Sequence, residues 1–431
     1  MPSLLVSNAP HVRSQEDTRA IMWTVIVMLI PAGLMGTVVF GWYAAFITVL
    51  SVLAAVVSEA ICQRIRKVPI TIGDGSAVLA GLLFAYVIPP NTPWYVVIIG
   101  AASAIVIGKH FFGGLGCNIW NPALVGRAVV GAGYASAIFL AQWPMIRRGA
   151  IESGTGWFGE RLAALKSSLY NIPKNINSEV DAIAQASPLN AVKHAASNAQ
   201  TMVEVSVGQG VDINAARDAI EGVGGSITPV AADAWEIAVE PSALDGLSNV
   251  LSGLDGLSIS QTIAPNVPDL VQTAVVNGQG ISLDYWNMLT GHQNGCIGET
   301  SAGLLLLGGL FLIFLKIVDW RIPLFYIGTT ALLSWILPIG NVGFFSGDPL
   351  FSVLAGGLMI GAFFMATDMV TSPMTGRGKI VFAIGCGVLT VLIRNFGGYP
   401  EGVCYSILLM NTAVPLIDRF FKPRLFGKVT K

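Results

Sequence analysis

The sequence predicts an all-α integral membrane protein of about ten transmembrane helices, forming two inverted five-helix repeats with a large extracytoplasmic insertion between them. Of the 431 residues, 53% are hydrophobic and only 11% are charged, whereas soluble proteins average about 25% charged residues. Apolar runs close to the roughly 20 residues that cross a bilayer recur along the chain. Two short motifs of the first group of runs return in the second group in the same order.

The predicted spans fall into two groups of five. They cover residues 21–40, 42–61, 76–88, 94–108 and about 122–143, and then about 302–318, 323–337, 351–367, 380–393 and 403–416. The first run is too long for a cleaved signal peptide, and no Ala-x-Ala site follows Phe40. The chain therefore divides into a cytoplasmic N-terminus (1–20), a first membrane repeat (21–143), an extracytoplasmic insertion (144–298), a second membrane repeat (299–417) and a basic cytoplasmic tail (418–431).

Basic residues predict the orientation of these spans. Fifteen lysines and arginines fall in the segments on one side, whereas the short turns on the other side hold none, with Arg394 alone at one edge. Positive residues mark the cytoplasmic side, and long translocated segments do not count in this comparison. Both termini are therefore predicted to be cytoplasmic, and the insertion is predicted to face outward.

Composition also excludes other classes of protein. Twenty-four basic and 25 acidic residues give a net charge of −1, which offers no electrostatic attraction for nucleic acid. The five cysteines form no CxxC pair, and the four histidines form no HxxH or HExxH motif. No metal site is therefore predicted.

The recurring motifs indicate an internal repeat. Val78–Gly81 in the third span returns as Val353–Gly356 in the eighth, and Lys109–Gly114 after the fourth span is echoed by Arg394–Gly398 after the ninth. Copies of five spans each must lie inverted in the membrane. Inverted repeats usually enclose a site near the midplane, beside interrupted helices.

Polar residues at membrane depth are candidates for that site, because an unpaired charge there costs at least about 2.5 kcal/mol. The candidates are Asp74, Asn118, Asn121, Arg127, Asp368, Arg394, Glu401 and Asn411. A structural interpretation is that Asp74, Arg394 and Glu401 cap helix ends. Arg127 needs a buried anion or a phosphate as its partner, and Asp368 is placed to meet a cation or a cofactor.

The insertion is richer in Asn, Ser, Gly, Asp and Glu than the rest of the chain. Its part from about 197 to 280 contains Gly-Leu and Asp-Gly repetitions and is predicted to be loop or irregular structure. No Ser/His/Asp arrangement or carboxylate pair there indicates catalysis.

Several motifs together carry a family resemblance. They are Ala9–Val12, Gly73–Ser76, Phe112–Gly114 with Asn121–Arg127, Gly298–Ser301, Met365–Asp368 with Thr371–Pro373, and Tyr399–Gly402. In these motifs the chain resembles the RnfD proteins of the Rnf ion-translocating oxidoreductase complexes and, more distantly, the NqrB proteins of the sodium-pumping NADH:quinone reductases. The resemblance covers nearly all of the predicted membrane region.

The resemblance implies a covalent flavin mononucleotide (FMN) on the outer face. In this family a threonine in a motif Asp-Gly-x-Ser-Gly-Ala-Thr is esterified by the flavin phosphate. Here Asp181–Ser187 has the same spacing and places Ser187 at the threonine position. A serine hydroxyl can form the same phosphoester, but the other motif changes leave open a decayed site. Thr228 is a fallback acceptor with different spacing.

The resemblance further implies a membrane component of a ferredoxin:NAD oxidoreductase in the bacterial cytoplasmic (inner) membrane, not catalytic alone. Its implied partners are the other Rnf subunits, a flavin transferase and membrane lipid. Asn118, Asn121 and Arg127 are candidate flavin contacts, with a second, non-covalent flavin left open. A tentative path for Na⁺ or H⁺ comprises Asp74, Asp368, Arg394 and Glu401. The alternatives are a redox-inactive channel or transporter for a small solute and a structural scaffold; flavin content separates the first alternative from the redox protein.

Overall fold

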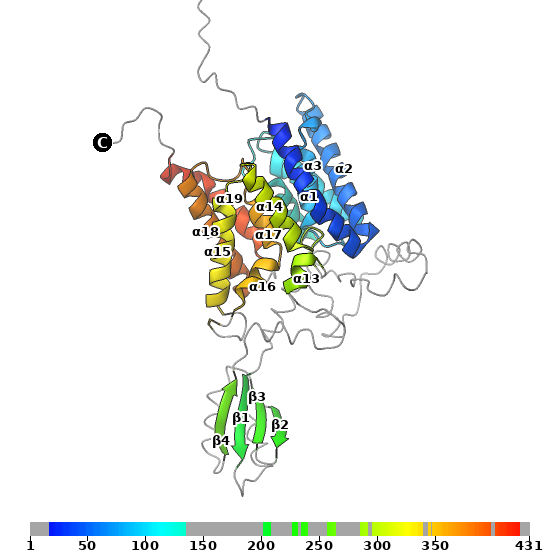
Figure 1. The fold of residues 1–431 in the computed structure, drawn as a ribbon. Helices are drawn as coiled ribbons and strands as arrows, with labels where there is room; N and C mark the ends of the chain where they lie inside the picture. The colour runs from blue at the N-terminus through cyan, green and yellow to red at the C-terminus, as the bar shows by residue number, and fades with distance from the viewer. Residues whose placement is uncertain are drawn as a thin grey trace, which may run out of the picture.

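The computed structural model describes residues 17–134, 201–207, 226–231, 234–239, 257–263, 285–291, 295–338, 344–345, 347–397 and 401–422. Figure 1 shows a bundle of helices built from both ends of the chain, and a small sheet drawn apart from it.

The N-terminal half supplies one group of helices. These are α1 (Thr18–Phe40), α2 (Trp42–Ile65), α3 (Ser76–Tyr86), α4 (Trp94–Ile105) with the π-helical turn η2 (Val106–His110), and α5 (Pro122–Gly133); a short 3₁₀ turn, η1 (Ile72–Asp74), precedes α3. Helix α3 has 11 residues, which at about 1.5 Å per residue span roughly 16 Å. That is about half of a hydrocarbon core roughly 30 Å thick, so α3 is a half-length helix.

The C-terminal half supplies the second group. It contains α13 (Tyr285–Thr290), α14 (Ala302–Phe314), α15 (Arg321–Ile336), α16 (Pro349–Leu354), α17 (Leu358–Ile360) with the π-helical turn η4 (Gly361–Met365), α18 (Gly376–Phe396) and α19 (Val403–Phe420). The eighth predicted span is therefore broken between α16 and α17. Gly356 and Gly357 adopt φ values of 69° and 67° at the break, a left-handed conformation that glycine reaches without a Cβ penalty.

Four helices, α1, α2, α18 and α19, are long and apolar enough to cross a membrane, and shorter apolar helices accompany them. Each predicted span coincides with a helix or with a broken helix over at least part of its length. The fifth predicted span is helical to Gly133, and its remainder lies outside the described residues beyond Tyr134. The chain is a multi-pass membrane protein.

Small and hydroxyl-bearing residues bring the helices together. Ser51 Oγ of α2 donates to the carbonyl of Gly81 in α3 at 2.6 Å. A hydroxyl cluster joins α15, α18 and α19, because Tyr326, Thr390 and Ser406 lie within 2.7 to 3.0 Å of one another. Close backbone approach and interhelical hydrogen bonds are the usual stabilising contacts where lipid removes the hydrophobic driving force.

The two groups of helices meet beside α5. Asn121, the N-cap of α5, donates from Nδ2 to the carbonyl of Met365 in η4 at 3.2 Å. Trp120 Nε1 donates to Thr412 Oγ1 of α19 at 2.9 Å. The interrupted eighth span is therefore tied directly to the start of the fifth.

The insertion contains a four-stranded antiparallel sheet. Its strands are β1 (Thr201–Val207), β2 (Ser226–Ala231), β3 (Ala234–Val239) and β4 (Leu257–Ile263), in the order β2-β3-β1-β4. The prediction of loop or irregular structure was wrong for these segments, and the membrane part alone is all helical among the described residues. The strand signal was present, since Leu257–Ile263 begins with the alternation of apolar and polar residues typical of a strand. The flanking Gly-rich repetitions obscured it.

Candidate functional site

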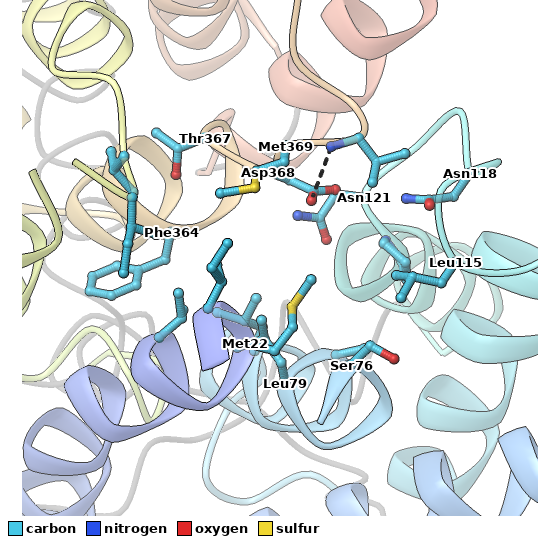
Figure 2. A pocket seen from close by; sticks show the side chains of 18 of the residues that line it. Met22, Ser76, Leu79, Leu115, Asn118, Asn121, Phe364, Thr367, Asp368 and Met369 are labelled. Carbon is cyan, nitrogen blue, oxygen red and sulfur yellow. Dashed lines mark hydrogen bonds between the residues drawn. The ribbon is translucent and has the colours of Figure 1, made fainter. Parts of the chain in front are cut away.

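A cavity of about 90 Å³ lies among α1, α3, α14, η4 and the segment before α5. Its walls are mainly apolar, and Figure 2 shows Met22, Leu79, Leu115 and Phe364 around it. Its polar lining consists of Ser76, Lys109, Asn118, Asn121, Thr367 and Asp368. Apolar walls with a few orienting polar groups are typical of a site for a small organic ligand.

The two asparagines differ in how their hydrogen bonds are satisfied. Asn121 caps α5, because its Oδ1 accepts from the N–H of Ala123 at 3.0 Å. Its Nδ2 donates to the carbonyl of Met365. Asn118 Nδ2 donates to the carbonyl of Trp120 at 3.3 Å. Its Oδ1 is buried and has no hydrogen-bond partner among the described residues. Asn118, a residue of the cavity lining, thus keeps a buried acceptor without a partner among the described residues.

The two aspartates near this end of the bundle have local partners. Asp74 Oδ1 accepts from the N–H and Oγ of Ser76 at 2.8 and 2.7 Å, at the start of α3. Asp368 lines the cavity, and its carboxylate accepts from Thr371 Oγ1 at 3.1 Å and the N–H of Val370 at 3.5 Å (Figure 2). Asp74 has the geometry of a helix-capping group, whereas Asp368 stands at the cavity wall.

A buried ion pair adjoins the cavity and was missed by the sequence analysis. Lys109 Nζ lies 2.7 and 2.8 Å from the two carboxylate oxygens of Glu59 in α2, and it also donates to Ser76 Oγ at 2.6 Å. Glu59 and Lys109 are 1% and 2% exposed. Lys109 was counted among the cytoplasmic charges, and the lone carboxylate of Glu59 inside an apolar span was the signal that could have revealed the pair.

A second polar cluster lies deeper, between α5, α18 and the start of α19. Arg127 of α5 forms a buried ion pair with Glu401, so the partner of Arg127 is an anionic side chain. Arg394 of α18 donates to the carbonyls of Ser352, Ala355 and Gly356 at 2.6 to 3.1 Å. These carbonyls end α16 at the helix break, so Arg394 stabilises a helix terminus with both hydrogen bonds and charge.

The segment before α14 adds two further groups to the deep cluster. Cys296, Glu299 and Glu401 are buried, and one ligand atom from each lies within 4.8 Å of the others. Backbone hydrogen bonds from Ile297 to Ile88 and from Gly298 to Tyr86, of 3.3 and 2.9 Å, hold this segment against the end of α3. Sequence analysis selected Glu401 but not Cys296 or Glu299, whose segment lies about a hundred residues before it in the chain.

The structure thus divides the predicted site residues. Asn118, Asn121 and Asp368 share the cavity. Arg127 does not line it and lies with Glu401 in the deep cluster instead. The predicted flavin-attachment residues Asp181 and Ser187 lie outside the described residues.

These features define a multi-pass membrane protein with a mainly apolar cavity beside an interrupted helix and a buried charged cluster. The model of the NQR2, RnfD, RnfE family matches residues 5–427. The chain belongs to that family.

Similar proteins cover the chain almost completely. The D subunit of the proton-translocating ferredoxin:NAD(+) oxidoreductase complex of Clostridium ljungdahlii is 40% identical over 98% of this chain and 96% of its own length. The D subunit of the Na(+)-translocating ferredoxin:NAD(+) oxidoreductase complex of Acetobacterium woodii is 35% identical over 100% of this chain and 96% of its own. The D subunit of the ion-translocating oxidoreductase complex of Stutzerimonas stutzeri is 32% identical, over 97% and 94%.

Proposed function

We propose that this chain is the RnfD-type membrane subunit of an ion-translocating ferredoxin:NAD oxidoreductase complex. One observation carries the proposal: the chain aligns over nearly its whole length, at 40% and 35% identity, with two proteins named as that component of such a complex. The membrane helices and the insertion are both included in these alignments. Because one relative is named as translocating protons and the other Na⁺, the transported ion is a separate question.

We propose that Ser187 carries FMN through a phosphoester on the outer face of the bacterial cytoplasmic membrane. The support is its position in a motif of matching spacing and the charge distribution that predicts an outward insertion with both termini inside. When bound, the flavin supplies one- and two-electron redox chemistry. The role of the protein is to hold the cofactor and keep it at the outer side.

In-gel fluorescence tests the attachment. The chain is produced together with its flavin transferase, denatured and separated, beside a Ser187→Ala variant and a Thr228→Ala control. A fluorescent wild-type band that is lost only in Ser187→Ala is the expected result. A dark wild-type band, with the transferase active on a known substrate protein, would exclude the covalent site and leave either a non-covalent flavin or the channel-like scaffold.

The cavity is proposed as the site of a second, non-covalent flavin. Its apolar walls and few polar groups suit a flat aromatic ring system. The buried Oδ1 of Asn118, which has no partner among the described residues, offers an acceptor for a ring N–H. Asn118 would orient the ligand, while Asn121 holds the cavity wall by joining α5 to η4.

An Asn118→Leu variant tests this assignment, since leucine is similar in size and cannot accept a hydrogen bond. Acid-extractable flavin per chain should fall in the purified complex, while the covalent fluorescent band stays. Unchanged extractable flavin would contradict the assignment.

We also propose that the two groups of helices form an inverted repeat with an ion path. The support comes from the contacts of two buried cations, Lys109 and Arg394. Lys109 donates to Ser76, two residues before the Val78–Gly81 motif. Arg394 donates to the carbonyl of Ser352, one residue before the second copy of that motif. Equivalent cations therefore contact nearly equivalent positions of α3 and α16. The proposed ion path passes Asp368 at the cavity and Glu401 in the deep cluster. Asp74 and Arg394 hold the helix ends along this path.

A further inference from the structure

A second pocket, of about 480 Å³, lies where three membrane helices end. It is formed by the end of α14, the loop to α15, the segment before α18 and the start of α18. Its lining contains three cationic side chains and one carboxylate, which are Lys316, Arg321, Lys379 and Asp319. Three positive charges against one negative give the lining a net charge of +2.

Asp319 cannot neutralise these cations. Its Oδ2 lies 3.0 Å from Nζ of Lys379 and 3.4 Å from Nη1 of Arg321, so one carboxylate oxygen serves two positive groups. Lys316 is exposed and has no ion-pair partner among the described residues. The carboxylate of Asp418 nearby accepts from the N–H of Met374 and does not line the pocket. The pocket therefore offers positive charge to a ligand.

The start of α18 adds to the positive potential. A Cβ atom on Gly376 would lie 2.6 Å from Nη1 of Arg321, so the guanidinium lies directly against the first residue of that helix. Neither α15 nor α18 has an acidic residue in its first turn. A helix N-terminus carries partial positive charge, which attracts anions and disfavours nearby cations. An anion in the pocket would therefore relieve the repulsion between Arg321 and α18.

Lys316 occupies a backbone position that glycine fills more easily. Its φ is 59°, and the N–H groups of Lys316 and Ile317 bond back to the carbonyls of Ile313 and Leu312 at 2.9 and 3.0 Å. This is the left-handed turn that commonly ends a helix with glycine. Because a side chain disfavours that conformation, the turn itself does not account for a lysine.

Exposed apolar side chains adjoin the basic pocket. Phe314, Trp320 and Met374 are 80%, 51% and 81% exposed. The guanidinium carbon of Arg321 lies 5.7 Å from the centroid of the Trp320 ring, within the range of a cation–π contact. Tryptophan is enriched at the depth of the lipid headgroups. Positive charge beside exposed apolar groups suits a ligand with an anionic head and acyl chains better than it suits a soluble anion.

We propose that Lys316, Arg321 and Lys379 bind the phosphodiester headgroup of an anionic phospholipid, whose acyl chains lie against Phe314 and Trp320. Basic pockets between membrane helices on the cytoplasmic side bind such headgroups, and the distribution of basic residues predicts that side for these helix ends. The inference goes beyond the proposed function, and it depends neither on the flavin assignments nor on the transported ion.

Lipid binding by the purified, delipidated complex tests the site. The complex is titrated with dioleoylphosphatidylglycerol or with dioleoylphosphatidylcholine, and native mass spectrometry counts the bound lipids. The wild type should bind at least one phosphatidylglycerol in preference to phosphatidylcholine. Lys316→Gly should raise the Kd of that lipid about fivefold, the effect of one lysine beside an anionic lipid surface. Lys67→Gly is the matched control, because Lys67 has the same left-handed conformation after α2, with φ 55°, and does not line the pocket.

The two glycine variants separate folding from binding. Glycine adopts the left-handed conformation without a Cβ penalty, so neither variant should lower the apparent Tm of the lipid-free complex. Added phosphatidylglycerol should raise the Tm of the wild type and of Lys67→Gly in a saturable way, because the lipid binds the folded state. The same rise should need more lipid in Lys316→Gly. Equal affinity of the two variants for phosphatidylglycerol would overturn the proposal.

Two further results would overturn the lipid assignment. If inorganic phosphate raises the Tm of the wild type but not of Lys316→Gly, and phosphatidylglycerol adds nothing to this rise, the ligand is a soluble anion. If an amine-reactive reagent labels Lys67 but not Lys316 in the lipid-free complex, another subunit covers the pocket. The proposal predicts labelling of both lysines without lipid, and protection of Lys316 alone by phosphatidylglycerol.

Discussion

The charge balance of the deep cluster predicts a coupling between its two paired residues. With Arg127 and Arg394 counted against Glu299 and Glu401, the side-chain charges of the cluster sum to zero. Arg127→Gln leaves a net charge of −1, and Glu401→Gln leaves a net charge of +1. Breaking a buried ion pair so that charge is left uncompensated costs about 3 to 5 kcal/mol.

Arg127→Gln and Glu401→Gln should therefore each lower the stability of the detergent-solubilised complex. Thermal unfolding followed by size-exclusion chromatography with fluorescence detection gives the order of apparent Tm values under identical heating. The double variant should melt above both single variants, because the charges of Arg394 and Glu299 then balance. A double variant that melts no higher than the single variants would refute the charge arithmetic.

Two other ion pairs give further predictions. Lys109→Met should destabilise the protein by about 3 to 5 kcal/mol by stranding the carboxylate of Glu59, and adding Glu59→Gln should recover much of the loss; no recovery in melting experiments would contradict the pairing. In the loop before α15, partial burial acts to raise the pKa of Asp319, but the backbone N–H of Arg321 and the ammonium of Lys379 outweigh it and lower that pKa below its ordinary value. A carboxyl whose pKa is lower in the folded state stabilises the fold at pH values above its unfolded-state pKa, and this stabilisation is lost as pH falls through the native pKa. Asp319→Asn should therefore lower the free energy of unfolding by up to about 1 kcal/mol near pH 7 and leave it unchanged in acid. A loss of stability that does not change with pH would contradict the assignment.

The membrane helices were predictable because a bilayer requires long apolar runs, and these are visible in the sequence without any knowledge of packing. The interruption at Gly356 and Gly357 was harder to predict, because glycine is frequent in unbroken membrane helices too. The close approach of Gly357 to Glu299 is a tertiary contact, which no local pattern in the sequence indicates.

The site residues were predictable one at a time and not as groups. Rarity at membrane depth identified Asn118, Arg127 and Glu401, since polar side chains there are costly. Their division between a cavity and a deep cluster depends on how distant segments pack, which no local pattern records. Cys296 and Glu299 were not selected as site residues because they lie outside the apolar runs, although Glu299 stands in the Gly298–Ser301 motif. Their place in the cluster depends on tertiary contacts, among them the backbone bonds of their segment to Tyr86 and Ile88.

The most direct test of the whole account measures ion uptake driven by electron transfer in inverted membrane vesicles. Vesicles containing the complete complex receive reduced ferredoxin and NAD⁺, and uptake of ²²Na⁺ and acidification of the lumen are followed together. The account predicts that one of the two ions accumulates during NADH formation, and that both NADH formation and uptake are lost when this chain is deleted and restored when it is supplied again. Undiminished NADH formation with ion uptake in the deletion would contradict the assignment of this chain as the ion-translocating membrane component.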